Sequence, residues 1–191
     1  MRLPEAAHTS QGWRIDEIVP DFRLEDVWAL PTPGGPNDFS LLVQGIASAD
    51  PARSLPRAAR TLWELRWKLG GLLGWDEPDT GLGSRVTSLR DRLPADLRDA
   101  PPGPAFDVLP FTSLYQLEHE WAAEIANRTV HAVMHLGWVP DGAGGYRGQM
   151  AVYAKPNGPL GSAYMAAIKP FRYLIVYPQM MREIERRWHE R

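Results

Sequence analysis

TVHAVMHLGWV, residues 129–139, is a long apolar run between turn residues, and it decides the fold. The turn PDGAGG (140–145) follows it, and QMAVYAK (149–155) returns after that turn. Ahead of it, EWAAEI (120–125) alternates polar and apolar residues with period two, as a half-buried strand does. Links this short bring neighbouring strands into antiparallel pairs. The sequence therefore predicts an antiparallel meander over residues 111–156.

The C-terminal part predicts one long helix that begins near Ser162. Its apolar residues recur with helical period and continue, with some drift, to the end of the chain: Tyr164, Ile168, Phe171, Ile175, Met181, Ile184 and Trp188. Pro170 and Pro178 lie inside this helix. Each removes a backbone hydrogen bond and crowds the preceding turn, so we expect a kink or a short break.

The N-terminal half predicts shorter elements. Residues 27–30 (VWAL) fit a short strand, and two helices are expected over residues 39–46 and 54–69, the second with Ser54 as its N-cap. Residues 76–110 predict a long loop, either a poorly ordered connection or a functional segment. Residues 1–20 are expected to be a weakly ordered lead-in to a single domain over 21–191. The predicted class is α+β, with a curved antiparallel sheet wrapped around the C-terminal helix and two shorter helices near the N-terminus.

Composition narrows the function classes. The chain has 191 residues, a net charge of −2 and no cysteine. The lack of a basic excess disfavours nucleic acid as a partner, and the lack of cysteine excludes thiolate zinc sites and is compatible with a cytoplasmic location. The most apolar stretch, residues 163–181, carries Lys169 and Arg172, so no membrane span is predicted. No motif for a nucleotide, a metal or another cofactor occurs, and none is expected.

Four segments of the sequence resemble a known family: RAARTLWELRWKLGGLLGW (57–75), SLRDRLP (88–94), ANRTVHAVMHLGWV (126–139) and GSAYMAAIKPFRYLIVYP (161–178). The chain resembles the bacterial domain-of-unknown-function family 2867. The order of elements also resembles the START-like or helix-grip scaffold of polyketide cyclases and lipid-transfer proteins. This resemblance implies a cavity between the sheet and the terminal helix that takes an apolar or amphipathic small molecule. It carries over no catalytic residue, and fold alone does not choose a function.

His131 and His135 are the first candidates for chemistry. Four residues apart on a strand, they point to one face, but their Cα atoms are about 13 Å apart, too far to share a metal ion. The other face carries Val130, Ala132, Met134, Leu136 and Trp138. That asymmetry favours a solvent-exposed face for the histidines over a catalytic one. If one of them, or Tyr153, meets the cavity instead, it could act as an acid or base.

The carboxylates Glu118, Glu120 and Glu124 are predicted to form a solvated strand face, because a buried carboxylate needs a partner. Lys169 and Arg172 lie on one face of the C-terminal helix and could either bind an anionic head group or pair with an acid. Arg90 could likewise either bind an anionic head group or pair with an acid.

The remaining candidate ligand contacts are aromatic or apolar: Tyr115, Trp121, Met134, Tyr164 and Ile168. A ligand pocket is mostly apolar with a few polar groups, but large aromatic side chains also simply fill cores. Three hypotheses follow from these residues. The chain binds a small molecule, or catalyses a cyclase- or isomerase-like reaction on the same scaffold, or forms a homodimer through surface tryptophans and the terminal helix.

Overall fold

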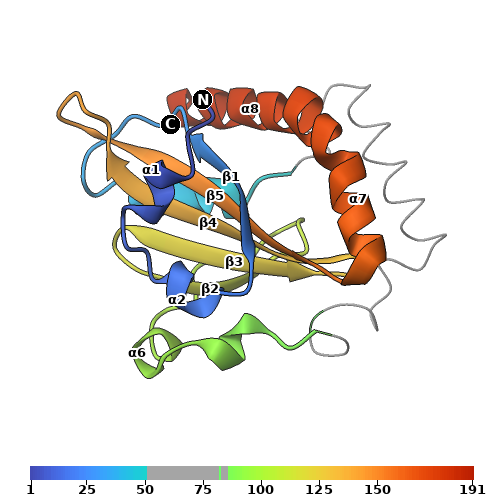
Figure 1. The fold of residues 1–191 in the computed structure, drawn as a ribbon. Coiled ribbons are helices and arrows are strands. Elements are labelled where there is room, and N and C mark those ends of the chain that lie inside the picture. The colour runs from blue at the N-terminus through green and yellow to red at the C-terminus, as the bar shows by residue number, and fades with distance from the viewer. Residues whose placement is uncertain (51–81, 83–85) are drawn as a thin grey trace.

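The computed structural model describes residues 1–50, 82 and 86–191. Its elements are, in chain order, α1 (Ala6–Thr9), α2 (Ile15–Ile18), β1 (Arg23–Ala29), α3 (Phe39–Ala47), the 3₁₀ turn η2 (Leu89–Arg92), α6 (Ala95–Arg98), β2 (Thr112–Gln116), β3 (Glu120–Ala126), β4 (Val130–Pro140), β5 (Tyr146–Pro156), α7 (Gly158–Phe171), the π-helical turn η3 (Arg172–Val176) and α8 (Tyr177–His189) (Figure 1). The helix predicted over residues 54–69 lies outside the described residues.

The strands form one antiparallel sheet in the order β1-β5-β4-β3-β2. β2 to β5 follow one another as a meander, as predicted for residues 111–156, because the turns between them are too short for any other connection. β1 joins the sheet beside β5, with a bulge between Leu24 and Asp26. The long strand β4 is therefore the central strand, and β5, the other long strand, lies between β4 and the edge strand β1.

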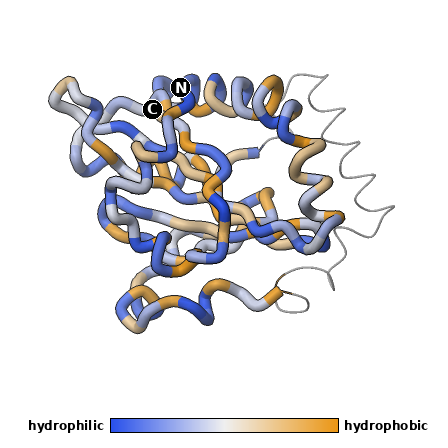
Figure 2. Tube along the Cα trace, in the orientation of Figure 1, coloured by the Kyte–Doolittle hydropathy of each residue, from blue (hydrophilic) through white to orange (hydrophobic). Residues whose placement is uncertain are grey.

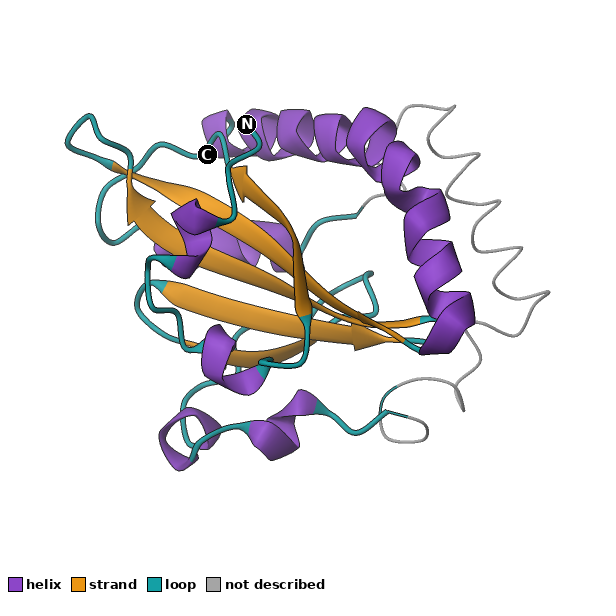
Figure 3. Ribbon diagram, viewed as in Figure 1, coloured by secondary structure: helices purple, strands orange, loops and turns teal. Residues whose placement is uncertain are grey.

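Two layers cover the sheet, one on each face (Figure 3). The side that we call the helix face carries Trp121, Leu136 and Met150 and packs against α3 and α8. The opposite side, the N-terminal face, carries Val133 and Ala151 and packs against α2, η2 and α6. Burial on both faces makes the sheet the middle layer of the described structure.

The N-terminal residues are part of this second layer, so the expectation of weak order for residues 1–20 is wrong. Ile15 and Ile18 of α2 are fully buried against the sheet. The Trp13 ring lies so close to Gly137 of β4 that a Cβ there would come within 2.5 Å of it. Apolar residues that look isolated in the sequence thus close the N-terminal face.

The C-terminal helix is continuous but bent between α7 and α8 (Figure 1). In the π-helical turn the Tyr177 N–H donates to the Arg172 carbonyl, five residues earlier. Pro178 has no N–H to give to the Leu174 carbonyl, and Pro170 weakens the turn before, so the helix widens here. The predicted kink is confirmed, without a break, and the helix begins at Gly158, ahead of the predicted Ser162. Figure 2 shows hydrophobic and hydrophilic residues alternating along α8, which buries one side only.

Candidate functional site

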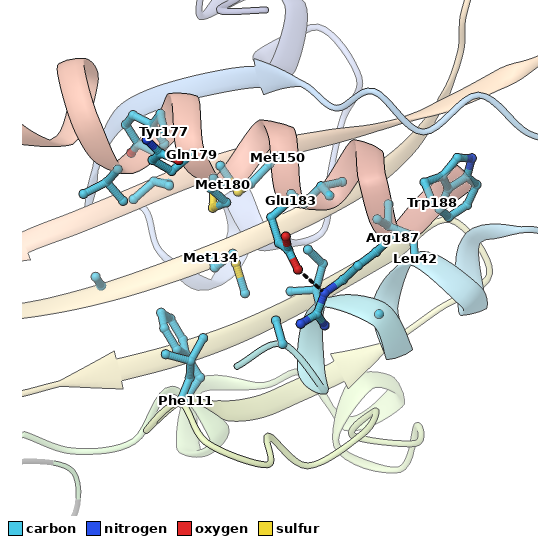
Figure 4. A pocket seen from close by; sticks show the side chains of 18 of the residues that line it. Leu42, Phe111, Met134, Met150, Tyr177, Gln179, Met180, Glu183, Arg187 and Trp188 are labelled. Atoms are coloured by element: carbon cyan, nitrogen blue, oxygen red, sulfur yellow. Dashed lines mark hydrogen bonds and ion pairs between the residues drawn. The ribbon is translucent and has the colours of Figure 1, made fainter. Parts of the chain in front are cut away.

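The described residues line a partly open cavity of about 320 Å³ between α8, α3 and the helix face of the sheet (Figure 4). β4 and β5 supply its floor, since their even-numbered residues point to this face. The apolar lining comprises Leu42 and Ile46 of α3, Leu109 and Phe111 ahead of β2, Ala132, Met134, Met150 and Val152 of the sheet, and Phe171, Ile175, Val176, Met180, Ile184 and Trp188 of the C-terminal helix. Its volume lies at the small end of the range for ligand pockets, roughly 300–1,000 Å³.

Among the described lining residues, the charged ones all come from α8 or the residues just after it. Glu183 and Arg187 are four residues apart and share one side of α8, and Arg191 lies two residues beyond the end of that helix. The Arg187 Nε atom lies 2.6 Å from Glu183 Oε1, and Figure 4 shows this pair projecting from α8 into the space beside α3. The Arg191 guanidinium stacks on the Trp188 ring, 3.7 Å from its centroid, and donates to the Leu41 carbonyl.

A buried polar cluster adjoins the cavity at the bend of the helix. Asp26 of β1, almost fully buried, accepts hydrogen bonds from Arg172, Tyr173 and Tyr177. The π-helical turn makes this possible, because its larger number of residues per turn brings residues 172 and 177, five apart, to the same side. Burial raises the pKa of Tyr177, so its hydroxyl stays protonated and donates to Asp26. This cluster fixes the bend to the edge strand β1.

The N-terminal face holds a second set of buried charges, which sequence reasoning placed in solvent. Glu120 accepts hydrogen bonds from the Tyr115 hydroxyl (2.5 Å) and from the backbone N–H groups of Arg14 and Ile15 at the start of α2, and His135 Nε2 lies 3.1 Å away. Burial alone would raise the pKa of Glu120, but the contact with His135 and these hydrogen bonds lower it. Glu120 therefore fastens α2 to the sheet.

Glu124 repeats this arrangement four residues further along β3. It accepts hydrogen bonds from the Ser88 hydroxyl (2.5 Å) and the Leu89 N–H (3.1 Å) at the start of η2, and His131 Nε2 lies 2.7 Å from its Oε2 atom. The predictions of a solvent-exposed face for the histidines and of a solvated strand face for Glu120 and Glu124 are wrong. The carboxylates are buried because they cap segments of the covering layer. Glu118 alone is exposed, with 84% of its side chain accessible.

A third buried group links the N-terminal segment to β5. The Tyr153 hydroxyl donates to Asp16 Oδ1 (2.6 Å) and lies 2.8 Å from His8 Nε2. With its own proton given to Asp16, the hydroxyl accepts from His8 Nε2–H, and His8 Nδ1 then accepts from Gln149 Nε2 at 3.3 Å. Burial, helped by His135 nearby, lowers the pKa of His8 to about 3. His8 is therefore neutral at physiological pH.

The candidate residues that were chosen from the sequence lie in different parts of the structure. Met134 lines the cavity, while Trp121 lies on the same face but stacks on Phe106 outside the lining. The other candidates do not line the cavity. Tyr164 and Ile168 belong to α7, Arg172 binds Asp26, and Arg90 donates to the Ser113 carbonyl. The last four lie on the N-terminal face: Tyr115, His131, His135 and Tyr153. No histidine is among the described residues that line the cavity.

Sequence reasoning missed Glu183 and Arg187. Their signal was an opposite-charge pair at four-residue spacing beside the apolar stripe of the terminal helix, a pattern that usually marks a solvent-exposed face. Within the described part of the chain, no group of three or more His, Asp or Glu side chains is arranged to hold a metal ion. No described helix combines the length and the apolar character that a membrane crossing requires.

Comparison with known proteins identifies a family but no individual relative. Searches of curated proteins and of solved structures each found no match. The family model described as "Protein of unknown function (DUF2867)" matches residues 18–179, which include the whole sheet, α3, α7 and the π-helical turn. The match covers well over half of the chain, and the protein therefore belongs to the DUF2867 family.

Proposed function

We propose that this protein binds an apolar or amphipathic small molecule in the cavity between the sheet and the C-terminal helix. The observation that carries the proposal is the cavity itself, about 320 Å³ with an almost wholly apolar lining on the described residues. Ligand sites are typically concave and mostly apolar, and an apolar lining left in contact with water is unfavourable unless a ligand covers it. A START-like binding role, as implied by the order of elements, fits the same location.

The buried polar groups support binding more than catalysis at this site. Histidine is the commonest acid–base group in enzymes, yet His131 and His135 lie on the far face of the sheet, each beside a carboxylate that holds a covering segment. Among the described lining residues, a reaction in the cavity would have to use Tyr177, Gln179, Glu183, Arg187 or Arg191. The Tyr177 hydroxyl already donates to Asp26, and the Glu183 carboxylate already accepts from Arg186 and Arg187. A cyclase- or isomerase-like enzyme is the second candidate function, and no described contact favours it.

Binding is tested with the uncharged fluorescent probe N-phenyl-1-naphthylamine and the full chain. We expect saturable binding of one probe per chain with enhanced fluorescence. Ala132→Phe places a ring in the cavity from its floor and should abolish that binding, whereas Ala95→Phe, the same change at an exposed position on α6, should leave it intact. Thermal melts check that both variants fold. Non-saturable probe binding, or full binding by a folded Ala132→Phe variant, would refute the proposal.

A further inference from the structure

The floor of the cavity is partly exposed, although it lies in the middle of the sheet. Met134 and Val152 are paired residues on the neighbouring strands β4 and β5, yet both are only half-buried. The next pair on the same face, Leu136 and Met150, is fully buried. The exposed surface of Met134 and Val152 faces the cavity, which both residues line. A bound molecule would therefore rest on these two side chains.

This part of the floor is also shallow. Ala132 lines the cavity two residues before Met134 on the same face of β4, and its partner on β5 is Ala154. Both side chains are single methyl groups, so they leave a low shelf beside Met134. A planar molecule lying along the sheet keeps contact with several of these side chains at once.

A second half-buried methionine faces this floor from the helix. Met180 of α8 lines the same cavity, and Figure 4 shows it reaching down from α8 with Met134 below it. Together with Met150, three of the six methionines in the chain line the cavity. A thioether is polarisable, and its sulfur makes favourable contacts with aromatic rings. Because Met134 and Met180 are both half-buried, neither simply fills a gap in a closed core, the usual role of methionine.

We infer, on the basis of the proposed binding function, that the ligand carries an aromatic ring held between the thioethers of Met134 and Met180. The ring lies against Ala132 and Val152 of the floor. An aliphatic ligand would be bound equally well by leucine at both methionine positions, because leucine has a similar volume. A sulfur on each side of the ring adds a contact that a saturated ligand does not receive.

The test compares 3-phenylpropan-1-ol with 3-cyclohexylpropan-1-ol, which have the same carbon skeleton and differ in whether the ring is aromatic. Each displaces N-phenyl-1-naphthylamine from the full chain, with the affinity of the probe itself determined for every variant. The two alcohols leave water with different ease, so the diagnostic quantity is the change in the ratio of their dissociation constants. In the double variant Met134→Leu with Met180→Leu, we expect the aromatic alcohol to lose about fivefold in affinity relative to the saturated one.

A measurement on the wild type needs no variant to fold. In protein labelled with ¹³C at the methionine methyl groups, 3-phenylpropan-1-ol should shift the resonances of Met134 and Met180 upfield through its ring current. The saturated alcohol should not produce this shift. Binding of the aromatic alcohol without a ring-current shift at either methyl group would overturn the inference.

Met165→Leu with Met181→Leu is the matched control, because these two methionines lie on the same terminal helix and are not among the lining residues. This variant should keep the wild-type ratio, and the same change of ratio in it would overturn the inference. An unchanged ratio in the folded cavity variant, whether both alcohols bind as before or both bind less, would also overturn it while leaving the binding function intact. Failure of the probe itself to bind the wild type would instead remove the proposed function.

Discussion

The Nε2 atom of His131 lies 2.7 Å from Oε2 of Glu124, and both side chains are buried. The two residues belong to neighbouring strands, and the same diagonal pairing recurs between His135 and Glu120. In each case the carboxylate also accepts backbone N–H groups at the start of a short helical segment outside the sheet. These pairs therefore hold the covering layer on the N-terminal face.

Glu124→Gln tests this role. The amide keeps the shape of the side chain but replaces one acceptor oxygen by a donor, which must then face either the Ser88 hydroxyl or the Leu89 N–H, because each of these now binds a different oxygen. We expect the free energy of unfolding, measured in urea, to fall by about 3 kcal/mol. Glu118→Gln, the same change at an exposed position, should alter it by less than about 0.5 kcal/mol. Similar small effects for both variants would contradict the assignment.

His8 predicts a pH dependence of stability. Its pKa is about 3 in the folded chain against an ordinary value of 6.5, so between these values the unfolded chain binds the extra proton. Stability should therefore fall as the pH drops below 6.5, by up to about 1.4 kcal/mol per pH unit. His8→Gln should remove this slope between pH 6.5 and 5, above the range in which carboxylates titrate. Urea melts at each pH measure it.

His119→Gln is the control for that measurement, because the His119 side chain is 42% exposed and lies outside the buried clusters. It should keep the wild-type slope. An unchanged slope in His8→Gln would show that His8 is not held neutral by burial.

The Asp26 cluster predicts a graded response to substitution. Tyr177→Phe removes one of three donors to the carboxylate and should cost about 1 kcal/mol of unfolding free energy. Asp26→Ala leaves the Arg172 guanidinium without its buried partner and should cost about 3–5 kcal/mol. Tyr146→Phe, at a half-buried tyrosine of β5, serves as the control and should change stability little. Equal costs for the two cluster variants would argue against a shared carboxylate.

At residue 161 we expect the usual preference for alanine over glycine within a helix to be reversed. Alanine is favoured over glycine inside a helix by about 1 kcal/mol, yet a Cβ at residue 161 would lie 2.1 Å from the Thr129 carbonyl oxygen. Because α7 must then move away from the turn between β3 and β4, Gly161→Ala should destabilise the protein by about 1–3 kcal/mol. The neighbouring, exposed Ser162→Ala should be neutral within about 0.5 kcal/mol. A stabilised Gly161→Ala variant in thermal melts would show that α7 does not pack closely here.

The sequence by itself determined the elements whose signal is local. The meander over β2 to β5 follows from alternating residues and short turns, and α3 follows from its apolar spacing. The bend between α7 and α8 follows from Pro170 and Pro178, whose missing N–H groups act wherever the helix lies. These features depend on residues close together in the chain, so the pattern is sufficient to find them.

Only the tertiary structure decided which groups are buried and what they meet. A strand with Glu120 and Glu124 on one side has the same pattern whether that side faces water or the N–H groups of α2 and η2, and those donors come from distant parts of the chain. Arg187 likewise has the spacing of a surface ion pair, and it reaches the cavity because the bent helix carries α8 back over the sheet. Burial is a property of packed layers, so no local period records it.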